Sequence, residues 1–194
     1  MSRTVGSIAT GYGGLDAAAT AVLGGELAWV ADNDPDVCKI LEDRFPGILN
    51  LGDITKVDWA AVPPVNIVTA GFPCQDVSVA GSREGLQSGN RSGLWLHIAH
   101  AISILNPAVV IVENVRGLLS ARAHSPVEPC PVCVGDSPAR RLRALGAVLG
   151  QLADLGFDAE WQVVSAADAG SCHKRERVFI WAWQVAADPG CREL

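Results

Sequence analysis

A strand, a glycine-rich turn and a helix follow one another at the start of the chain, and this order constrains the fold more than any other feature. Residues 5–9 are predicted to form a strand, residues 10–14 contain three glycines, and residues 15–23 favour a helix by propensity. Gly11 and Gly13 allow the backbone to approach a ligand closely, and the start of the helix offers unpaired N–H groups. A nucleotide-type α/β fold is indicated, although a tight turn without a ligand is equally compatible with these residues.

An acidic residue follows the next predicted strand. Residues 26–31 are mostly apolar and lead into Asp32, about twenty residues beyond the glycines. An acidic side chain at this position commonly binds the hydroxyl pair of a ribose. Asp34 and Pro35 are better suited to starting the helix at residues 36–44, because proline is favoured in a first helical turn. Farther on, Asp53 either accepts a hydrogen bond from an adenine amino group or caps a turn.

The remaining predicted elements alternate between strands and helices. The further strands are expected at residues 66–70, 108–112, 160–164 and 178–183. One further helix is expected to begin within residues 92–95 and to end at residues 106–107, and another is expected at residues 139–155. We therefore predict an α/β fold with a doubly wound, mostly parallel sheet, helices on both faces and a closing antiparallel strand pair. The chain is interpreted as one domain over residues 1–194 with an irregular insertion at residues 121–138.

Composition and charge limit the class of protein. The 194 residues suffice for one α/β domain, and a content of 49% hydrophobic against 19% charged residues argues against disorder. The net charge of −6 argues against a general nucleic-acid coat, although basic clusters at residues 140–143 and 173–177 could face phosphates. A solvated surface is the favoured interpretation of the first cluster. No membrane-spanning run or signal peptide is visible, so we expect a soluble, cytoplasmic protein.

The six cysteines are too few and too irregularly spaced for a disulfide framework. Cys130 and Cys133 form half of a zinc knuckle, and a zinc site would need two more ligands from Cys172, His173 or His124. Because a second pair at knuckle spacing is absent from the sequence, we predict no metal.

Cys74 lies in a loop that directly follows the predicted strand at residues 66–70. A neighbouring proline and flanking glycines shape this loop, and a thiol held there is suited to act as a nucleophile. Residues 81–93 are rich in Gly, Ser, Arg and Asn, which is typical of a segment that closes over a substrate. Glu113 follows a later strand. Since the carboxyl ends of parallel strands share one edge of a sheet, we expect Cys74 and Glu113 to converge, although 39 residues separate them.

The loop around Cys74 resembles the catalytic loop of cytosine-5 DNA methyltransferases. Its sequence is Gly-Phe-Pro-Cys-Gln at residues 71–75, followed by Ser78 and by Ala-Gly at residues 80–81. Other short motifs resemble those of the same family, in the same order. They are residues 10–14, Asp32, Asp53 with Ile54, residues 91–94, residues 113–115, and a basic motif with Arg175 and Arg177. His173 stands where the family has glutamine, and the resemblance runs from about residue 4 to residue 183.

The resemblance implies a Rossmann-like methyltransferase fold with S-adenosylmethionine as cofactor and DNA as partner. The residues implied to bind the cofactor are Thr10, Gly11, Tyr12, Gly13, Gly14, Leu15, Asp32, Asn33, Asp53, Ile54, Gly71, Pro73 and Leu94. Those implied to act in catalysis are Cys74, Glu113, Arg175 and Arg177. Those implied to contact DNA are Gln75, Ser78, Arg91 and Asn114.

In the chemistry implied by the resemblance, the target cytosine leaves the duplex and Cys74 adds to carbon 6 of its ring. Glu113 protonates or hydrogen-bonds ring nitrogen 3, which eases that addition. Carbon 5 then attacks the methyl group of S-adenosylmethionine, and loss of the carbon 5 proton and of the thiol completes the cycle. Arg175 and Arg177 hold the base carbonyl or stabilise charge on the adduct.

The end of the sequence leaves alternatives open. The family normally continues into a target-recognition domain and a final helix, whereas this sequence ends at Leu194. The chain is interpreted as a catalytic domain that a second polypeptide complements, as a fragment, or as a non-catalytic remnant that binds cofactor or DNA. Restriction–modification is one biological role that the resemblance implies. A dinucleotide-dependent oxidoreductase would suit the glycine turn and Asp32 but offers no role for Cys74 or Glu113.

Overall fold

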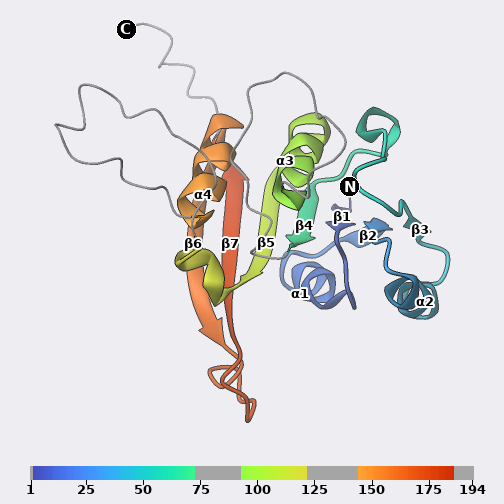
Figure 1. Ribbon diagram of the computed structural model, residues 1–194. Helices are drawn as coiled ribbons and strands as arrows, with labels where there is room; N and C mark the ends of the chain where they lie inside the picture. Colours follow the sequence, from blue (N-terminus) through green and yellow to red (C-terminus); the bar gives the residue numbers. More distant parts are fainter. Residues whose placement is uncertain (1, 73–92, 122–143, 186–194) are drawn as a thin grey trace, which may run out of the picture.

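The computed structural model describes residues 2–72, 93–121 and 144–185, and within them the chain forms one seven-stranded sheet with helices on both faces (Figure 1). The strand order is β3-β2-β1-β4-β5-β7-β6. Neighbouring strands from β3 to β5 pair in parallel, whereas β7 runs antiparallel between β5 and β6. The predicted doubly wound, mostly parallel sheet with a closing antiparallel pair is confirmed.

The bounds of the elements follow the sequence pattern closely. The strands are β1 (Thr4–Ile8), β2 (Glu26–Ala31), β3 (Leu49–Asn50), β4 (Ile67–Gly71), β5 (Val109–Val115), β6 (Phe157–Ser165) and β7 (Glu176–Gln184). The α-helices are α1 (Gly14–Leu23), α2 (Pro35–Arg44), α3 (Leu94–Leu105) and α4 (Ala144–Asp154), with short 3₁₀ helices at Trp59–Ala61 and Arg116–Leu119. The two-residue strand β3 was not predicted, because so short an element has no measurable periodicity.

Two local predictions concern the start of α2. Asp34 is its N-cap, and one carboxylate oxygen accepts hydrogen bonds from the backbone N–H groups of Asp36 and Val37 at 2.9 and 3.1 Å. Pro35 occupies the first helical position, where its missing N–H group has no cost. The helix-starting role predicted for Asp34 and Pro35 is therefore confirmed, and Asp32 remains available to the edge of the sheet.

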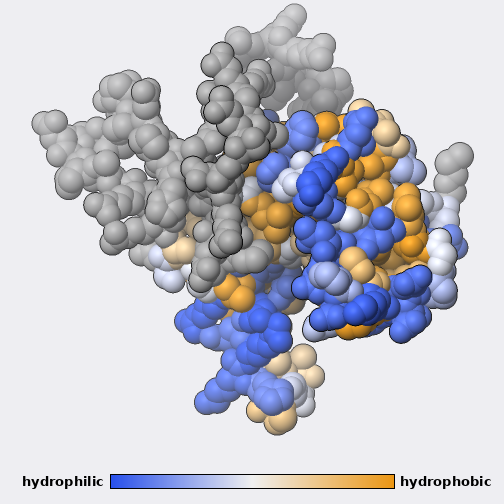
Figure 2. All heavy atoms as spheres, turned by 45° about the vertical axis from the view of Figure 1, so that its right-hand side comes forward, coloured by the Kyte–Doolittle hydropathy of each residue, from blue (hydrophilic) through white to orange (hydrophobic). Residues whose placement is uncertain are grey.

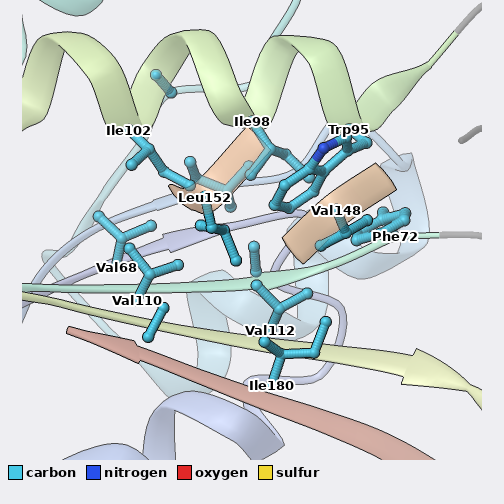
Figure 3. Close-up of a cluster of buried hydrophobic side chains, with 14 of the residues drawn as sticks. Val68, Phe72, Trp95, Ile98, Ile102, Val110, Val112, Val148, Leu152 and Ile180 are labelled. Atoms are coloured by element: carbon cyan, nitrogen blue, oxygen red, sulfur yellow. The ribbon is translucent and has the colours of Figure 1, made fainter. Parts of the chain in front are cut away.

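Helices α3 and α4 cover one face of the sheet and enclose the main hydrophobic core (Figure 3). The buried side chains labelled there come from β4, the residue that follows it, β5 and β7 on one side and from α3 and α4 on the other. They are Val68, Phe72, Trp95, Ile98, Ile102, Val110, Val112, Val148, Leu152 and Ile180. Because central parallel strands are buried on both faces, these strands read as continuous apolar runs.

Helix α1 packs on the opposite face, where α2 also lies (Figure 1). A smaller cluster joins Ala19 of α1 to Val5, Ile67 and Ile111 on three adjacent strands. This packing places the start of α1 at the carboxyl ends of β1 and β4, which is where ligands collect in sheets of this kind. The fold therefore presents the glycine turn to the same edge as Glu113.

The β6–β7 hairpin projects beyond the rest of the sheet (Figure 1). Its tip spans residues 166–175. At this lower end of the molecule, strongly hydrophilic residues gather beside residues of intermediate hydropathy (Figure 2). Cys172, His173 and Lys174 are all exposed at the tip. In the part of the chain that the structure describes, no helix is long and apolar enough to cross a membrane, and no three side chains are grouped as metal ligands. Cys130, Cys133 and His124 lie outside the described residues.

Candidate active site

The carboxyl ends of β1, β4 and β5, the start of β7 and the first turn of α1 surround a cavity of about 600 Å³. The predicted cofactor-binding residues that line it are Thr10, Gly11, Tyr12, Gly14, Leu15 and Gly71. Of the predicted cofactor-binding residues, one lies outside the described residues, Pro73. Six others do not line this cavity: Gly13, Asp32, Asn33, Asp53, Ile54 and Leu94. The cavity thus joins the glycine turn to Glu113, Arg175 and Arg177, which also line it.

The glycine turn adopts an unusual backbone conformation. Ala9, Gly11 and Gly13 have φ angles of 51°, 55° and 72°, in the left-handed region that non-glycine residues seldom occupy. The turn is closed by a hydrogen bond of 3.0 Å from the Gly13 N–H to the carbonyl of Thr10. Strain of the kind seen at Ala9 clusters at ligand sites, where the surrounding structure maintains it.

Asp32 connects the end of β2 to this turn. Its Oδ2 accepts a hydrogen bond of 2.9 Å from the backbone N–H of Gly11, and its Oδ1 accepts one of 3.0 Å from the N–H of Asp34. The predicted ribose-binding residue is therefore adjacent to the glycine turn. Its carboxylate orders the turn and retains further lone pairs for a ligand.

Asn50 of β3 holds Asp32 in place, and sequence reasoning missed this residue. Its Oδ1 accepts hydrogen bonds from the N–H groups of Asp32 and Gly52 at 3.1 and 3.0 Å, and its Nδ2 donates to the carbonyl of Asp32 at 3.1 Å. Nδ2 also lies 3.3 Å from Sγ of Cys38. No local pattern marks Asn50, because its partners are brought together only when β3 pairs with β2.

Asp53 performs the turn-capping role that was one of its two predicted alternatives. It accepts hydrogen bonds from the N–H and hydroxyl groups of Thr55 at 3.0 and 2.7 Å and pairs with Lys56 at 3.0 Å. The Thr55 hydroxyl, followed by the interaction with Lys56, lowers the pKa of the Asp53 carboxyl. The adenine contact stays a prediction.

Glu113 and Arg177 form an ion pair inside the cavity. Nε of Arg177 lies 2.7 Å from Oε1 of Glu113, and the two side chains are 23% and 33% exposed. Glu113 stands opposite Gly71 in the sheet register, and a Cβ at Gly71 would lie 3.7 Å from Oε2 of Glu113. A small residue at the end of β4 therefore leaves room beside the carboxyl group. The second arginine, Arg175, directly precedes β7 and lines the same cavity.

Asn114 faces the other side of the sheet from Glu113. Its side chain is buried, and its Nδ2 donates a hydrogen bond of 2.7 Å to the carbonyl of Phe72. The Phe72 ring also packs on Trp95 with ring centroids 5.2 Å apart. Asn114 thus holds the carbonyl of Phe72, the last described residue before the Cys74 loop, and it also lines the cavity. The DNA contact predicted for Asn114 stays a prediction.

The remaining predicted site residues cannot be placed. Cys74, Gln75, Ser78 and Arg91 lie outside the described residues. The convergence expected for Cys74 and Glu113 therefore stays a prediction. What the structure does place is Phe72, two residues before Cys74, among the residues that line the cavity.

The family model for C-5 cytosine-specific DNA methylase matches residues 4–189 of the chain. The Type II methyltransferase M.NlaIV of Neisseria lactamica is 32% identical over 155 residues, covering 80% of this chain and 34% of that protein. The Type II methyltransferase M.DsaV of Dactylococcopsis salina is 31% identical over 162 residues, covering 84% of this chain and 40% of that protein. The chain thus spans between a third and two fifths of the length of these curated relatives.

Solved structures share the fold. The S. pombe Dnmt2 methyltransferase superposes with a TM-score of 0.67 at 18% identity, covering 94% of this chain and 51% of that one. At this level of identity, the likeness concerns the fold alone.

Proposed function

The chain belongs to the C-5 cytosine-specific DNA methylase family, and from this membership we propose that it is the catalytic domain of a DNA methyltransferase that acts on carbon 5 of cytosine. The observation that carries the proposal is the cavity in which the glycine turn and the Glu113–Arg177 pair face the same space. A cofactor site and a proton-handling carboxyl group would share that space. Phe72 lines it as well, so the Cys74 loop begins at its wall.

The residues present suit S-adenosylmethionine as cofactor. A Cβ at Gly11 or at Gly14 would meet no other protein atom within 4 Å, so open space lies beside the turn. Asp32, fixed by Asn50, is positioned to bind a ribose hydroxyl pair. Asp53 and Ile54 are proposed to contact the adenine. When bound, S-adenosylmethionine supplies the methyl group.

The proposed chemistry assigns one role to each side chain. The thiolate of Cys74 adds to carbon 6 of a flipped cytosine, while Glu113 gives a proton or a hydrogen bond to ring nitrogen 3. The electron pair from that addition makes carbon 5 the nucleophile. Carbon 5 later loses its proton to a base, and the thiolate of Cys74 leaves. Arg177 orients Glu113 through their ion pair, and Arg175 faces the base carbonyl.

Recognition of DNA is proposed to involve residues on two sides of the cavity. Gln75, Ser78 and Arg91 belong to the Cys74 loop, and the exposed tip of the β6–β7 hairpin carries His173 and Lys174. Positive side chains there would contact phosphates, a sequence-independent interaction. Because the matched relatives are much longer than this chain, target recognition is proposed to come from a further part of the protein or from a second polypeptide.

The proposal is tested with radiolabelled S-adenosylmethionine and mixed-sequence DNA. We expect transfer of label by the wild type, none by Cys74→Ser, and unchanged transfer by the control Cys172→Ser, which removes an exposed thiol at the hairpin tip. Glu113→Gln should lower the rate by about 10²–10⁴, the usual contribution of a general acid. Both active-site variants should still bind the cofactor.

Two outcomes would contradict the proposal. Equal transfer by Cys74→Ser and the wild type would remove the thiol from the mechanism. Cofactor binding without transfer by the wild type, and without a covalent complex on DNA containing 5-fluorocytosine, would favour a non-catalytic binding module.

A further inference from the structure

A buried carboxyl group forms part of the cavity wall and has no role in the chemistry described above. Asp16 lies in the first turn of α1, is 2% exposed and lines the cavity. The hydroxyl of Thr69 in β4 donates a hydrogen bond to its Oδ1, and the hydroxyl of Ser7 in β1 interacts with the same carboxyl group. Ser7 and Thr69 stand opposite each other in the sheet register, so α1, β1 and β4 meet at this group.

Glu113, the other acidic side chain among the described residues that line the cavity, and Asp32, which lies outside that lining, already have partners. Glu113 of β5 is paired with Arg177 of β7, and Asp32 beyond β2 accepts hydrogen bonds from two backbone N–H groups. Asp16 forms no ion pair with any residue that the structure describes. Arg44 of α2 attracts the carboxyl group from a distance, and Arg175 is the remaining cation that lines the cavity. The carboxyl group of Asp16 therefore has no cationic partner in an ion pair among the described residues.

Fold stability does not account for this carboxyl group. Burial raises the pKa of Asp16, although the hydroxyls of Thr69 and Ser7 and the charge of Arg44 act in the opposite direction. A carboxyl pKa that is higher in the folded than in the unfolded protein favours folding below the unfolded pKa. That contribution is lost as the pH rises through the folded pKa. When Asp16 is ionised in the folded protein, its burial thus lowers the free energy of unfolding.

We propose that Asp16 is the counter-charge for the cationic methionine end of S-adenosylmethionine and thereby selects the charged cofactor. This inference rests on the proposed function, because it presumes that this cofactor occupies the cavity. Its α-ammonium and sulfonium groups are positive, and a carboxylate in a poorly solvated wall attracts cations more strongly than one in water. Thr69 is two residues before Gly71 on the same face of β4, so Asp16 lies about 7 Å along the strand from the position opposite Glu113.

The test compares three ligands that share the adenosine part and differ in charge at the other end. Of the two positive groups, S-adenosylmethionine carries the ammonium and the sulfonium, S-adenosylhomocysteine only the ammonium, and 5′-methylthioadenosine neither. The first two ligands also share an α-carboxylate. In Asp16→Asn, we expect the affinity for S-adenosylmethionine to fall by about tenfold or more, that for S-adenosylhomocysteine to fall less, and that for 5′-methylthioadenosine to change less than about twofold. Asp158→Asn, at an exposed position of β6, is the matched control and should alter none of the three.

The pH profile separates this role from a structural one. In the wild type, the affinity for S-adenosylmethionine should fall as the pH is lowered and Asp16 takes up a proton, and Asp16→Asn should lose that dependence. Thr69→Val removes a hydrogen bond that favours the ionised carboxyl, so its loss of affinity should begin at higher pH. At alkaline pH, this variant should bind as tightly as the wild type, which keeps the test informative if Asp16→Asn folds poorly.

Each remaining result has a definite meaning. A uniform loss for all three ligands in Asp16→Asn, or no loss for any, would overturn the inference and leave the proposed function intact. An unshifted pH profile in Thr69→Val would also overturn it. If the wild type bound none of the three ligands, the proposed function and this inference would both fail.

Discussion

Replacing Gly13 by alanine should destabilise the protein, whereas the same change at Gly14 should not. Gly13 is the N-cap of α1 with a φ of 72°, a conformation that costs a non-glycine residue about 1–2 kcal/mol. A Cβ there would also lie 2.5 Å from the ring of Phe45. That ring cannot move freely, because the guanidinium of Arg44 lies 5.5 Å from its centroid and donates a hydrogen bond of 2.7 Å to the carbonyl of Tyr12. Displacing the ring adds about 1–3 kcal/mol.

The expected total for Gly13→Ala is a loss of about 2–5 kcal/mol in the free energy of unfolding, measured by urea denaturation. Gly14 begins the helix, and a Cβ there meets no other atom within 4 Å. Gly14→Ala should therefore leave the free energy unchanged or raise it by up to about 1 kcal/mol. Equal unfolding midpoints for the two variants would refute the argument from backbone conformation and from contact with Phe45.

Two further changes test contacts around the cavity. Asn50→Asp replaces the amide nitrogen that donates to the carbonyl of Asp32 by an oxygen, so urea denaturation should show a loss of about 1–3 kcal/mol in the free energy of unfolding. Calorimetry should show a weaker cofactor affinity. Wild-type values for both would contradict the proposed positioning of Asp32. Arg177→Gln removes the partner of Glu113, and since the pair is partly exposed its loss should cost only about 1 kcal/mol of stability. The rate of methyl transfer should fall by about tenfold or more, and a rate equal to that of the wild type would exclude a role for Arg177 in orienting Glu113.

Motifs whose interacting residues lie close together in the chain could be predicted from the sequence alone. The glycine turn, the Asp34–Pro35 helix start and the strand that ends before Asp32 all lie within a few residues of their partners. The hydrogen bond from Asn114 to the Phe72 carbonyl shows the limit of such reading, because the motif around Asn114 does not reveal it. A motif indicates which residue types occur together, but only the strand register shows that Asn114 and Glu113 point to opposite faces.

The amino-acid sequence by itself determined the order of strands and helices, the family resemblance and the identity of the proposed nucleophile and carboxyl group. Only the tertiary structure decided that Arg177 pairs with Glu113, that Asn50 fixes Asp32, and that Asp16 is buried against Thr69, 53 residues away. The reason is physical. Periodicity and propensity act over a few residues, whereas the pairing of β4 with β1 and β5, and the burial that follows from it, depend on which distant strands become neighbours.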